Sequence, residues 1–413
     1  MTFFDVVVVG AGQAGLAMSH ELILRGVDHL VLERGEIGGA WRTSRWDSLR
    51  LLTPNWANGL PGVPYSGPDP HGFMPVREFA NTLTDYAETM SAPVKTNTRV
   101  ERVHKTTDGF DVRTSEGHYE CRALVLASGA CARPQVPCIA LDVPADVHHT
   151  TPSRYRRPAD LPPGEVMVVG ASASGVQLAR EIHRSGRPVT LSVGAHTRLP
   201  RTYRGRDIEW WLVVTGMMDV GLDEIDDVER ARRTPSPQLV GGGQPVDLNA
   251  LQDIGIEIVG RLAGIRGSKA LFSGGLAQVC ASADLKMDRF LTVIDDLVRV
   301  HGGEHFESAD RPQPTRLPAS PTLEKQLGGG AIRSIVWATG YRPDFSYLDL
   351  PVFDRRRRLI ERGGVCGIPG LYALGLPFLR QRRSPQISGV GPDSAAVSQH
   401  LGAFLSGQTE IAA

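Results

Sequence analysis

The feature that most constrains this chain is its beginning, where four consecutive valines run directly into a glycine-rich turn. Val6 to Val9 form a β-branched run typical of a buried parallel strand, and residues 10–15 read Gly-Ala-Gly-Gln-Ala-Gly before a helix-like stretch to Leu24. A strand, a tight turn and a helix N-terminus in this order are typical of a dinucleotide site. Gly10 permits the turn, Gly12 lets the backbone approach a pyrophosphate, and Gly15 lets helix and strand pack closely. The glycine pattern alone would also suit an ordinary tight β–α turn.

A second apolar segment strengthens the dinucleotide interpretation. Residues 29–32 read His-Leu-Val-Leu and end in Glu33, 21 residues beyond Gly12. An acid at the tip of the second strand can accept hydrogen bonds from a ribose diol. The first unit is therefore predicted to bind a dinucleotide.

The opening unit is repeated about 160 residues later. Val166 to Val169 are followed by Gly170 to Gly175, with Ser172 where the middle glycine stood, and by a helical pattern to about Arg184. Two such units predict an α/β fold with two Rossmann-like dinucleotide-binding domains, the second inserted in the first. We expect residues 1–158 to form the first part of one domain, 159–320 to form the inserted domain with a partly helical insert at 203–300, and 321–413 to return to the first domain.

The second unit differs from the first at the end of its next strand. Residues 189–193 end without an acid, and the cationic or titratable side chains of His196, Arg198, Arg201 and Arg204 follow. Cationic groups would pair with a 2′-phosphate, which a carboxylate would repel, so this pattern favours NADPH over NADH. The alternative is that these side chains are solvated surface charge.

A loop with two tryptophans follows the first unit. It contains Gly38-Gly39, Trp41 and Trp46. Such a loop could fold over a flat ring system, or its tryptophans could simply anchor it to the core.

The rest of the chain has a mixed pattern of helices and strands. Apolar residues at 79, 83, 86, 87 and 90 predict one face of a helix. We expect strands at 99–103, 110–114, 119–123, 124–126, 255–261, 270–272, 335–337 and 371–375, further helices at 207–217, 283–300 and 389–405, and an irregular loop at 233–246.

Composition points to a small-molecule partner. The 413 residues carry 45 Lys plus Arg and 45 Asp plus Glu, so no basic field indicates nucleic acid or an anionic membrane. Five cysteines lack a Cys-x-x-Cys pair, which disfavours a disulfide framework, a metal site and a dithiol redox centre. The first strand begins too early for a signal peptide, and no apolar run approaches the roughly 18 residues of a membrane span. We expect a cytoplasmic protein, with a homodimer as an open possibility.

Together these residues resemble the flavin-containing (class B) monooxygenases, within the two-dinucleotide-binding flavoproteins. The resemblance is carried by the turn at 10–15 with Glu33, the Gly-Gly-x-Trp of 38–41, the turn at 170–175 and the Ala-Thr-Gly-Tyr of 338–341. It implies that the first unit binds FAD and the second NADPH. The implied FAD contacts are Gly10, Gly12, Gln13, Gly15, Glu33, Arg34, Gly39, Trp41, Arg50, Val100, Gly129, Gly375 and Asp393. The implied NADPH contacts are Gly170, Ser172, Ser174, Gly175, Ser192, His196, Arg198 and Thr339.

The resemblance also implies a reaction. NADPH would reduce FAD, and O2 would react at flavin carbon 4a to give a (hydro)peroxyflavin that transfers one oxygen atom to a small organic substrate. The family's Phe-x-Gly-x-x-x-His-x-x-x-aromatic signature is incomplete at 138–155, where His148, His149 and Tyr155 stand at a different spacing. N- or S-oxygenation is therefore favoured over ketone (Baeyer-Villiger) oxygenation. A reductase or dehydrogenase without oxygen insertion and a non-catalytic flavin-binding protein stay open, and Asn55 and Asn58 are the candidate catalytic side chains.

Overall fold

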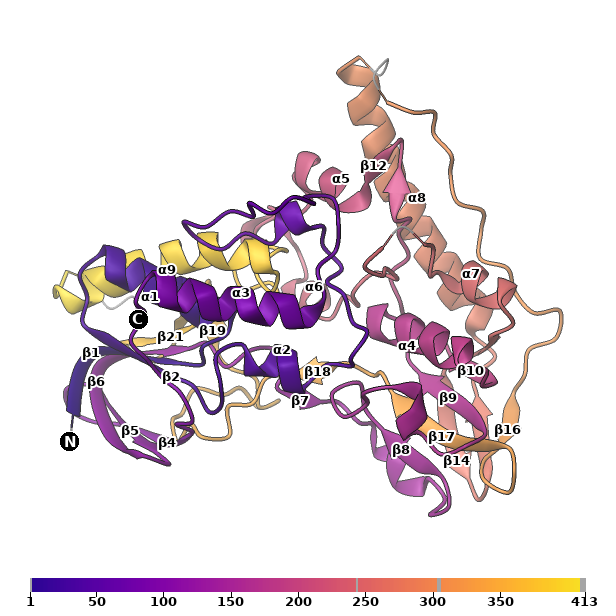
Figure 1. Cartoon of the computed structure of the whole chain (residues 1–413), viewed down its shortest axis with the longest axis horizontal. Coiled ribbons are helices and arrows are strands. Elements are labelled where there is room, and N and C mark those ends of the chain that lie inside the picture. The colour runs from indigo at the N-terminus through magenta and orange to yellow at the C-terminus, as the bar shows by residue number, and fades with distance from the viewer. Residues whose placement is uncertain (1, 243, 303–305, 409–413) are drawn as a thin grey trace.

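The molecule consists of two α/β units side by side. The computed structural model describes residues 2–242, 244–302 and 306–408. In Figure 1 the N-terminal unit, with α1, α3 and α9, lies on the left, and the unit containing α4 lies on the right. This confirms the α/β class and the two parallel sheets expected from the two valine-rich strands.

The first unit is built on a mixed sheet with a parallel centre. The parallel strands are ordered β3 (Val94–Lys95), β2 (His29–Leu32), β1 (Thr2–Val9), β6 (Gly117–Leu126) and β21 (Leu371–Ala373). The antiparallel edges are β4 (Val100–Lys105) with β5 (Phe110–Thr114), and β19 (Glu361–Arg362) with β20 (Val365–Cys366). Helices α1 (Gln13–Leu24), α2 (Gly39–Thr43), α3 (Val76–Thr89) and α9 (Val390–Leu405) pack on it.

One strand joins what the sequence presented as two. The segments 119–123 and 124–126 belong to the single strand β6, which pairs antiparallel with β5 and parallel with β1. The alternation of exposed and buried residues at its start changes to a fully buried run at its end, because only the end lies in the centre of the sheet.

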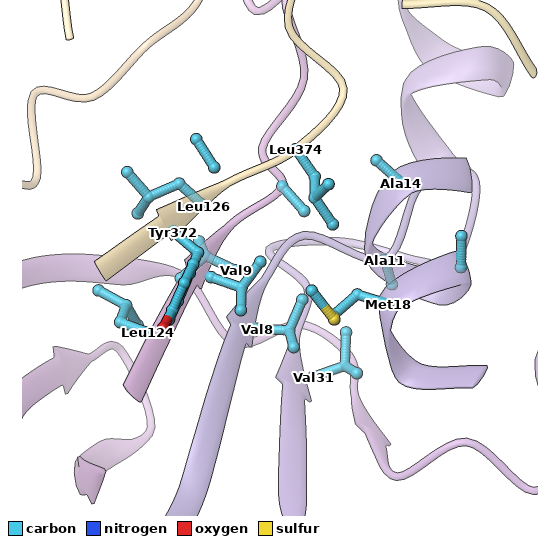
Figure 2. Packing of buried hydrophobic residues seen from close by; sticks show 14 of the residues in the cluster. Val8, Val9, Ala11, Ala14, Met18, Val31, Leu124, Leu126, Tyr372 and Leu374 are labelled. Atoms are coloured by element: carbon cyan, nitrogen blue, oxygen red, sulfur yellow. The ribbon is translucent and has the colours of Figure 1, made fainter. Parts of the chain in front are cut away.

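The core of this unit lies where the central strands meet the first helix. Figure 2 shows Val8 of β1 and Val31 of β2 beside Met18 of α1, with Leu126 of β6 and Tyr372 of β21 farther across the sheet in the same cluster. The valine run is buried on both faces because strands flank it and helices cover it, which is why its sequence does not alternate. This packing holds the turn after Val9 in a fixed place.

The second unit repeats the same plan. Its parallel sheet has the order β13 (Glu257–Val259), β10 (Val189–Ser192), β9 (Glu165–Val169), β17 (Ile332–Trp337) and β8 (His148–Thr150), with α4 (Ala173–Arg184) following β9. Strands β8 and β17 lie outside the range 159–320, so the sheet draws on more of the chain than the predicted inserted domain. The three predicted boundaries themselves stay a prediction.

A helical insert rises above the second sheet. It includes β11 (Thr202–Tyr203), β12 (Arg206–Asp207), α5 (Ile208–Val214), α6 (Val228–Arg232), α7 (Leu248–Asp253) and the long α8 (Leu276–Val300), which extends away from the sheets in Figure 1. The smaller strands β7 (Arg133–Pro134), β14 (Leu262–Arg266), β15 (Lys269–Phe272), β16 (Glu324–Gln326) and β18 (Tyr341–Arg342) complete the chain. Within the residues that the structure describes, no helix combines the length and apolar character needed to cross a bilayer.

Candidate functional site

Four of the predicted contacts of the first unit lie at one edge of its sheet. Gly10, Glu33, Gly129 and Gly375 each follow the carboxyl end of one of the parallel strands β1, β2, β6 and β21. The chain runs from β1 outward to β2 and β3, and returns on the other side through β6 and β21. Ligands of such sheets bind at this reversal, beyond the carboxyl ends of the strands.

The first glycine-rich turn has one glycine for each geometric requirement. Gly10 has φ +108°, and a Cβ there would lie 2.6 Å from the Ala127 carbonyl oxygen. A Cβ on Gly15 would lie 1.8 Å from the Gly10 oxygen, so helix and strand could not approach as they do. By contrast, a Cβ on Gly12 would meet nothing within 4 Å. The turn therefore requires Gly10 and Gly15 for folding and leaves open space beside Gly12, as a bound pyrophosphate requires.

Glu33, the predicted ribose acceptor, lies against the first glycine-rich turn. Its Oε2 atom accepts a hydrogen bond from the Ala11 backbone N–H at 2.8 Å, and its Oε1 atom accepts one from the Gly35 N–H at 3.1 Å. A carboxylate oxygen can accept more than one hydrogen bond, so both oxygens retain capacity for ribose hydroxyls.

The tryptophan loop lies against the same turn. The Trp41 indole N–H donates to the Gln13 side-chain oxygen at 3.3 Å, and its ring meets Phe79 edge-on at 5.1 Å. Arg45 lies over Trp41 at 5.2 Å and over Tyr341 at 5.9 Å, so it links this loop to the strand pair β7 and β18. Trp46 is different, because it is buried in the core of the second unit and serves as an anchor.

Asp393 provides a buried acceptor at the start of α9. Its side chain is 2% exposed, and within the described residues its Oδ2 atom has no hydrogen-bond partner. Burial raises the pKa of this carboxyl to about 6, against the lowering effect of Ser384 and Arg380. An unsatisfied buried oxygen here fits a hydroxyl group of FAD that would donate to it.

The other predicted FAD contacts have diverse surroundings. Gly375 packs against α1, since a Cβ there would lie 2.9 Å from the Ala14 Cβ, whereas Gly129 has open space around it. Val100 is buried in β4. Arg34 is exposed, Gly39 begins α2, and the exposed Arg50 donates to the Phe73 carbonyl at 2.7 Å.

The second glycine-rich turn copies the first. Gly170 also has φ +108°, and a Cβ on Gly175 would lie 1.8 Å from the Gly170 oxygen. Ser172 stands at the helix N-cap with φ −82° and ψ −175°, close to the −86° and −173° of Gly12. Ser174 is half-buried in the first turn of α4. The backbone N–H groups of α4 are thus arranged for a second pyrophosphate.

Arg198, one of the cationic residues predicted to bind a 2′-phosphate, already forms ion pairs within the protein. Arg198 is 3% exposed, and its guanidinium donates to Asp247 at 2.6 and 3.0 Å and to Asp284 at 2.7 Å. Burial alone would lower the pKa of Arg198, but the two carboxylates raise it. Its partners lie 49 and 86 residues away, so local sequence could not reveal them.

The remaining side chains of that cluster are also engaged. Arg201 pairs with Asp207, and Arg204 donates to Asp295 at 2.7 Å. His196 is buried, and burial lowers its pKa below the usual range, so the neutral ring brings no charge. The sequence-based reason for NADPH is therefore corrected, because folding neutralises the predicted cluster.

Two further predicted nicotinamide-side contacts have backbone partners. Ser192 is buried, where its hydroxyl donates to the Gly260 carbonyl at 3.1 Å and accepts from the Leu262 N–H at 2.9 Å. Thr339, after β17, donates to the Gln135 carbonyl.

The candidate catalytic asparagines hold the loop that follows the tryptophans. Asn55 donates to the Asp69 carbonyl at 2.8 Å and accepts from the Met74 N–H at 2.8 Å. Asn58 donates to the carbonyls of Thr53 and Pro54 at 3.2 and 3.1 Å. Both amides are buried and engaged with nearby backbone, so this geometry supports a structural role.

The residues of the incomplete family signature have structural partners as well. His148 and His149 lie in β8, where the Trp337 indole N–H donates to His149 at 3.3 Å. The buried Tyr155 hydroxyl donates to Glu181 at 2.9 Å.

Sequence reasoning missed two features near the second turn. Gln238, in the predicted irregular loop, is 1% exposed and donates to the Ala171 carbonyl at 2.9 Å. Arg261 is exposed just beyond β13, which pairs with β10 through Val259 and Ser192. Gln238 belongs to no motif or periodic pattern, and Arg261 is only the last residue of the strand predicted at 255–261. Only the pairing of distant strands and loops places both residues near the second turn.

Known proteins are similar to this chain in sequence or in fold. Residues 7–211 match the family model of pyridine nucleotide-disulphide oxidoreductases. The "Uncharacterized oxidoreductase CzcO-like" of Geobacillus kaustophilus is 31% identical over 394 residues, covering 94% of this chain and 96% of the relative. The indole-3-pyruvate monooxygenase YUCCA6 of Arabidopsis thaliana is 32% identical over 214 residues, 48% of this chain and 50% of the relative. A flavin-containing monooxygenase structure from Stenotrophomonas maltophilia superposes with a TM-score of 0.64 at 20% identity, covering 98% of this chain and 99% of the other.

Proposed function

This chain belongs to the CzcO-like oxidoreductases, within the two-dinucleotide-binding flavoproteins that include the flavin-containing monooxygenases, and from that premise we propose that it is an NADPH-dependent FAD monooxygenase. The observation that carries the proposal is the pair of matching glycine-rich turns, each at the carboxyl edge of its own parallel sheet. One chain with two such turns can hold a flavin and its hydride donor together.

The first unit fits FAD through its backbone and a few side chains. The open space beside Gly12 would admit the pyrophosphate, Glu33 would accept hydrogen bonds from the adenosine ribose, and Asp393 has an unsatisfied oxygen that could accept one more. When bound, FAD supplies the redox chemistry with the hydride donor and O2. The protein's part is to align the nicotinamide, exclude water and admit the substrate.

We propose NADPH as the donor on a basis other than the arginine cluster. Val9 pairs with Leu32 before Glu33, and Val169 pairs with Ser192 before Val193, so Val193 stands where the first unit has its acid. No carboxylate at that position repels a 2′-phosphate, and Arg261 presents a cation at the end of the adjoining strand.

Kinetics with both nucleotides test this choice. Arg261→Glu should raise the Michaelis constant for NADPH roughly tenfold and leave that for NADH within about twofold, as expected for one lost charge-assisted contact. Arg266→Glu, at another exposed arginine on β14, is the matched control and should change neither. If the wild type prefers NADH, or if Arg261→Glu raises both Michaelis constants equally, Arg261 does not bind the 2′-phosphate.

For the substrate we propose a small molecule with an oxidisable nitrogen or sulfur. The support is the stretch 138–155, where the Phe-x-Gly-x-x-x-His-x-x-x-aromatic signature of the flavin-containing monooxygenases is incomplete and its histidines lie in β8. The test is a panel of amines, thioethers and ketones, scored by NADPH consumption above background and by product mass.

The outcomes separate the candidate activities. Substrate-dependent NADPH consumption with an oxygen atom added to the substrate supports the proposal. Flavin reduction with electrons passed to an acceptor and no added oxygen would instead indicate a reductase. Ketone-to-ester conversion alone would indicate Baeyer-Villiger oxygenation.

A further inference from the structure

The segment 235–241, which we call the clamp segment, lies directly across the second glycine-rich turn. The Gln238 amide donates to the Ala171 carbonyl at 2.9 Å, and the Gln177 amide of α4 donates to the Leu239 carbonyl at 2.8 Å. Both glutamine side chains are buried. Two side-chain amides thus fasten an otherwise irregular loop to the start of α4.

The other edge of the clamp segment is held by the loop that follows β10. The Gln238 N–H donates to the Thr197 carbonyl at 2.9 Å, and the Thr197 hydroxyl donates to the Pro235 carbonyl at 2.9 Å. The segment therefore spans the ends of both strands at which the second unit would bind its nucleotide.

The first unit has a counterpart in the same place. There the Gly38 N–H approaches the Ala11 carbonyl at 3.4 Å, and Trp41 donates to Gln13. Ala11 and Ala171 occupy equivalent positions, each directly after the first glycine of its turn. In each unit a segment from elsewhere in the chain covers the turn and contacts the carbonyl of this alanine. In the first unit, that covering segment is the predicted FAD-contacting loop.

Gln238 also carries an unsatisfied atom. Its Oε1 atom is buried and, within the part of the chain that the structure describes, has no hydrogen-bond partner, while its Nε2 atom is engaged. Buried amide oxygens normally accept a hydrogen bond. Ribose hydroxyls and the nicotinamide carboxamide N–H groups are donors that a nucleotide on this turn would bring.

From these contacts we propose that the clamp segment closes over the bound nicotinamide nucleotide, and that Gln238 accepts a hydrogen bond from it. This inference rests on the proposed function and names a contact of the same site. The segment also reaches the first unit, because a Cβ on Gly241 would lie 2.5 Å from the Leu51 carbonyl oxygen and 2.6 Å from the Arg50 Cβ. Nucleotide binding at the second turn would thereby further stabilise a segment that already packs on the loop containing Arg50 and Leu51.

The test uses the FAD-loaded protein and NADP+ as the probe. Gln238→Leu and Gln238→Glu are each titrated with NADP+, followed by the flavin spectrum and by hydrogen exchange of residues 235–241. Gln238→Leu should bind NADP+ about five- to tenfold more weakly, the effect of one lost hydrogen bond in a buried site. Gln238→Glu keeps an acceptor oxygen but loses the donor to the Ala171 carbonyl and adds a negative charge beside an anionic nucleotide, so it should also bind NADP+ more weakly. NADP+ should protect the clamp segment in the wild type and protect it less in both variants. Gln244→Leu, at an exposed glutamine just beyond the segment, is the matched control and should bind as the wild type does.

A purely structural role would give a different result. In that case the variants would have a lower melting temperature without NADP+, but would bind NADP+ with wild-type affinity, and the inference would be overturned. Unchanged exchange of residues 235–241 in the wild type on adding NADP+ would overturn it as well. If the wild type binds neither NADP+ nor NADPH, the proposed function itself fails, which is a distinct outcome.

Discussion

Substituting an outer glycine of the first turn should destabilise the fold, whereas substituting the middle glycine should weaken FAD binding and leave the fold stable. Gly12 has φ −86°, and its Cβ would enter open space, so Gly12→Val should cost the FAD-free protein about 1 kcal/mol or less, the difference between glycine and a poor N-cap residue. In the FAD-bound state the same side chain occupies the space of the pyrophosphate. Losing two charge-assisted hydrogen bonds from the helix N-terminus, at about 1.5–3 kcal/mol each, weakens FAD binding at least about 100-fold.

Gly15→Ala is the comparison for this prediction. Its Cβ would lie 1.8 Å from the Gly10 backbone oxygen, and this clash can be relieved only if α1 moves away from β1. We expect a loss of about 3 kcal/mol or more in the stability of the FAD-free protein.

Both variants are assayed by the melting temperature without FAD and by the flavin-to-protein ratio after reconstitution. A Gly12→Val protein that binds FAD stoichiometrically with wild-type affinity would refute the site. A Gly12→Val protein as unstable as Gly15→Ala would refute the open space beside Gly12.

Three further predictions concern stability. Arg198→Ala should destabilise the protein by about 3–5 kcal/mol in urea unfolding, because it leaves Asp247 and Asp284 without their buried partner; a loss below about 1 kcal/mol would contradict this. Trp46→Ala should cost about 3–5 kcal/mol through the cavity it leaves in the second core, measured in the same way, and a wild-type unfolding midpoint would exclude the anchor role. Burial raises the pKa of Asp393 to about 6, so the folded state retains a proton that the unfolded state releases as pH rises from about 4 to 6. The free energy of unfolding of the FAD-free protein should therefore fall by up to about 3 kcal/mol over this pH range. Asp393→Asn should remove this pH dependence, and a variant with the same pH dependence as the wild type would assign it to another group.

The sequence predicted the scaffold well because the scaffold depends on local patterns. The valine run, the two glycine-rich turns and the helices after them are each specified within about 25 residues, and all appear at the expected places. The pattern of buried residues in α3 likewise matches the apolar spacing at 79, 83, 86 and 87. Hydrophobic periodicity and the positions of glycine are sufficient to predict an element whose structure is determined by its own residues.

What the sequence could not provide depends on partners far along the chain. Arg198 looks like a free cation until Asp247 and Asp284 fold against it. Gln238 looks like part of a polar loop until it reaches Ala171, 67 residues earlier. Contacts between side chains of distant loops produce no periodic pattern in the sequence. A charged residue after a strand therefore predicts a binding site only if no other residue of the folded chain pairs with it.

The most direct test of the whole account is the flavin spectrum of the purified wild type, reconstituted with FAD and mixed anaerobically with NADPH. The account predicts a yellow protein whose flavin absorbance bleaches with NADPH and returns on mixing with air, with an oxygenated product when substrate is present. A protein that takes up no FAD, or whose flavin stays oxidised with both NADPH and NADH, would contradict the claim that the two turns hold a flavin and its hydride donor together.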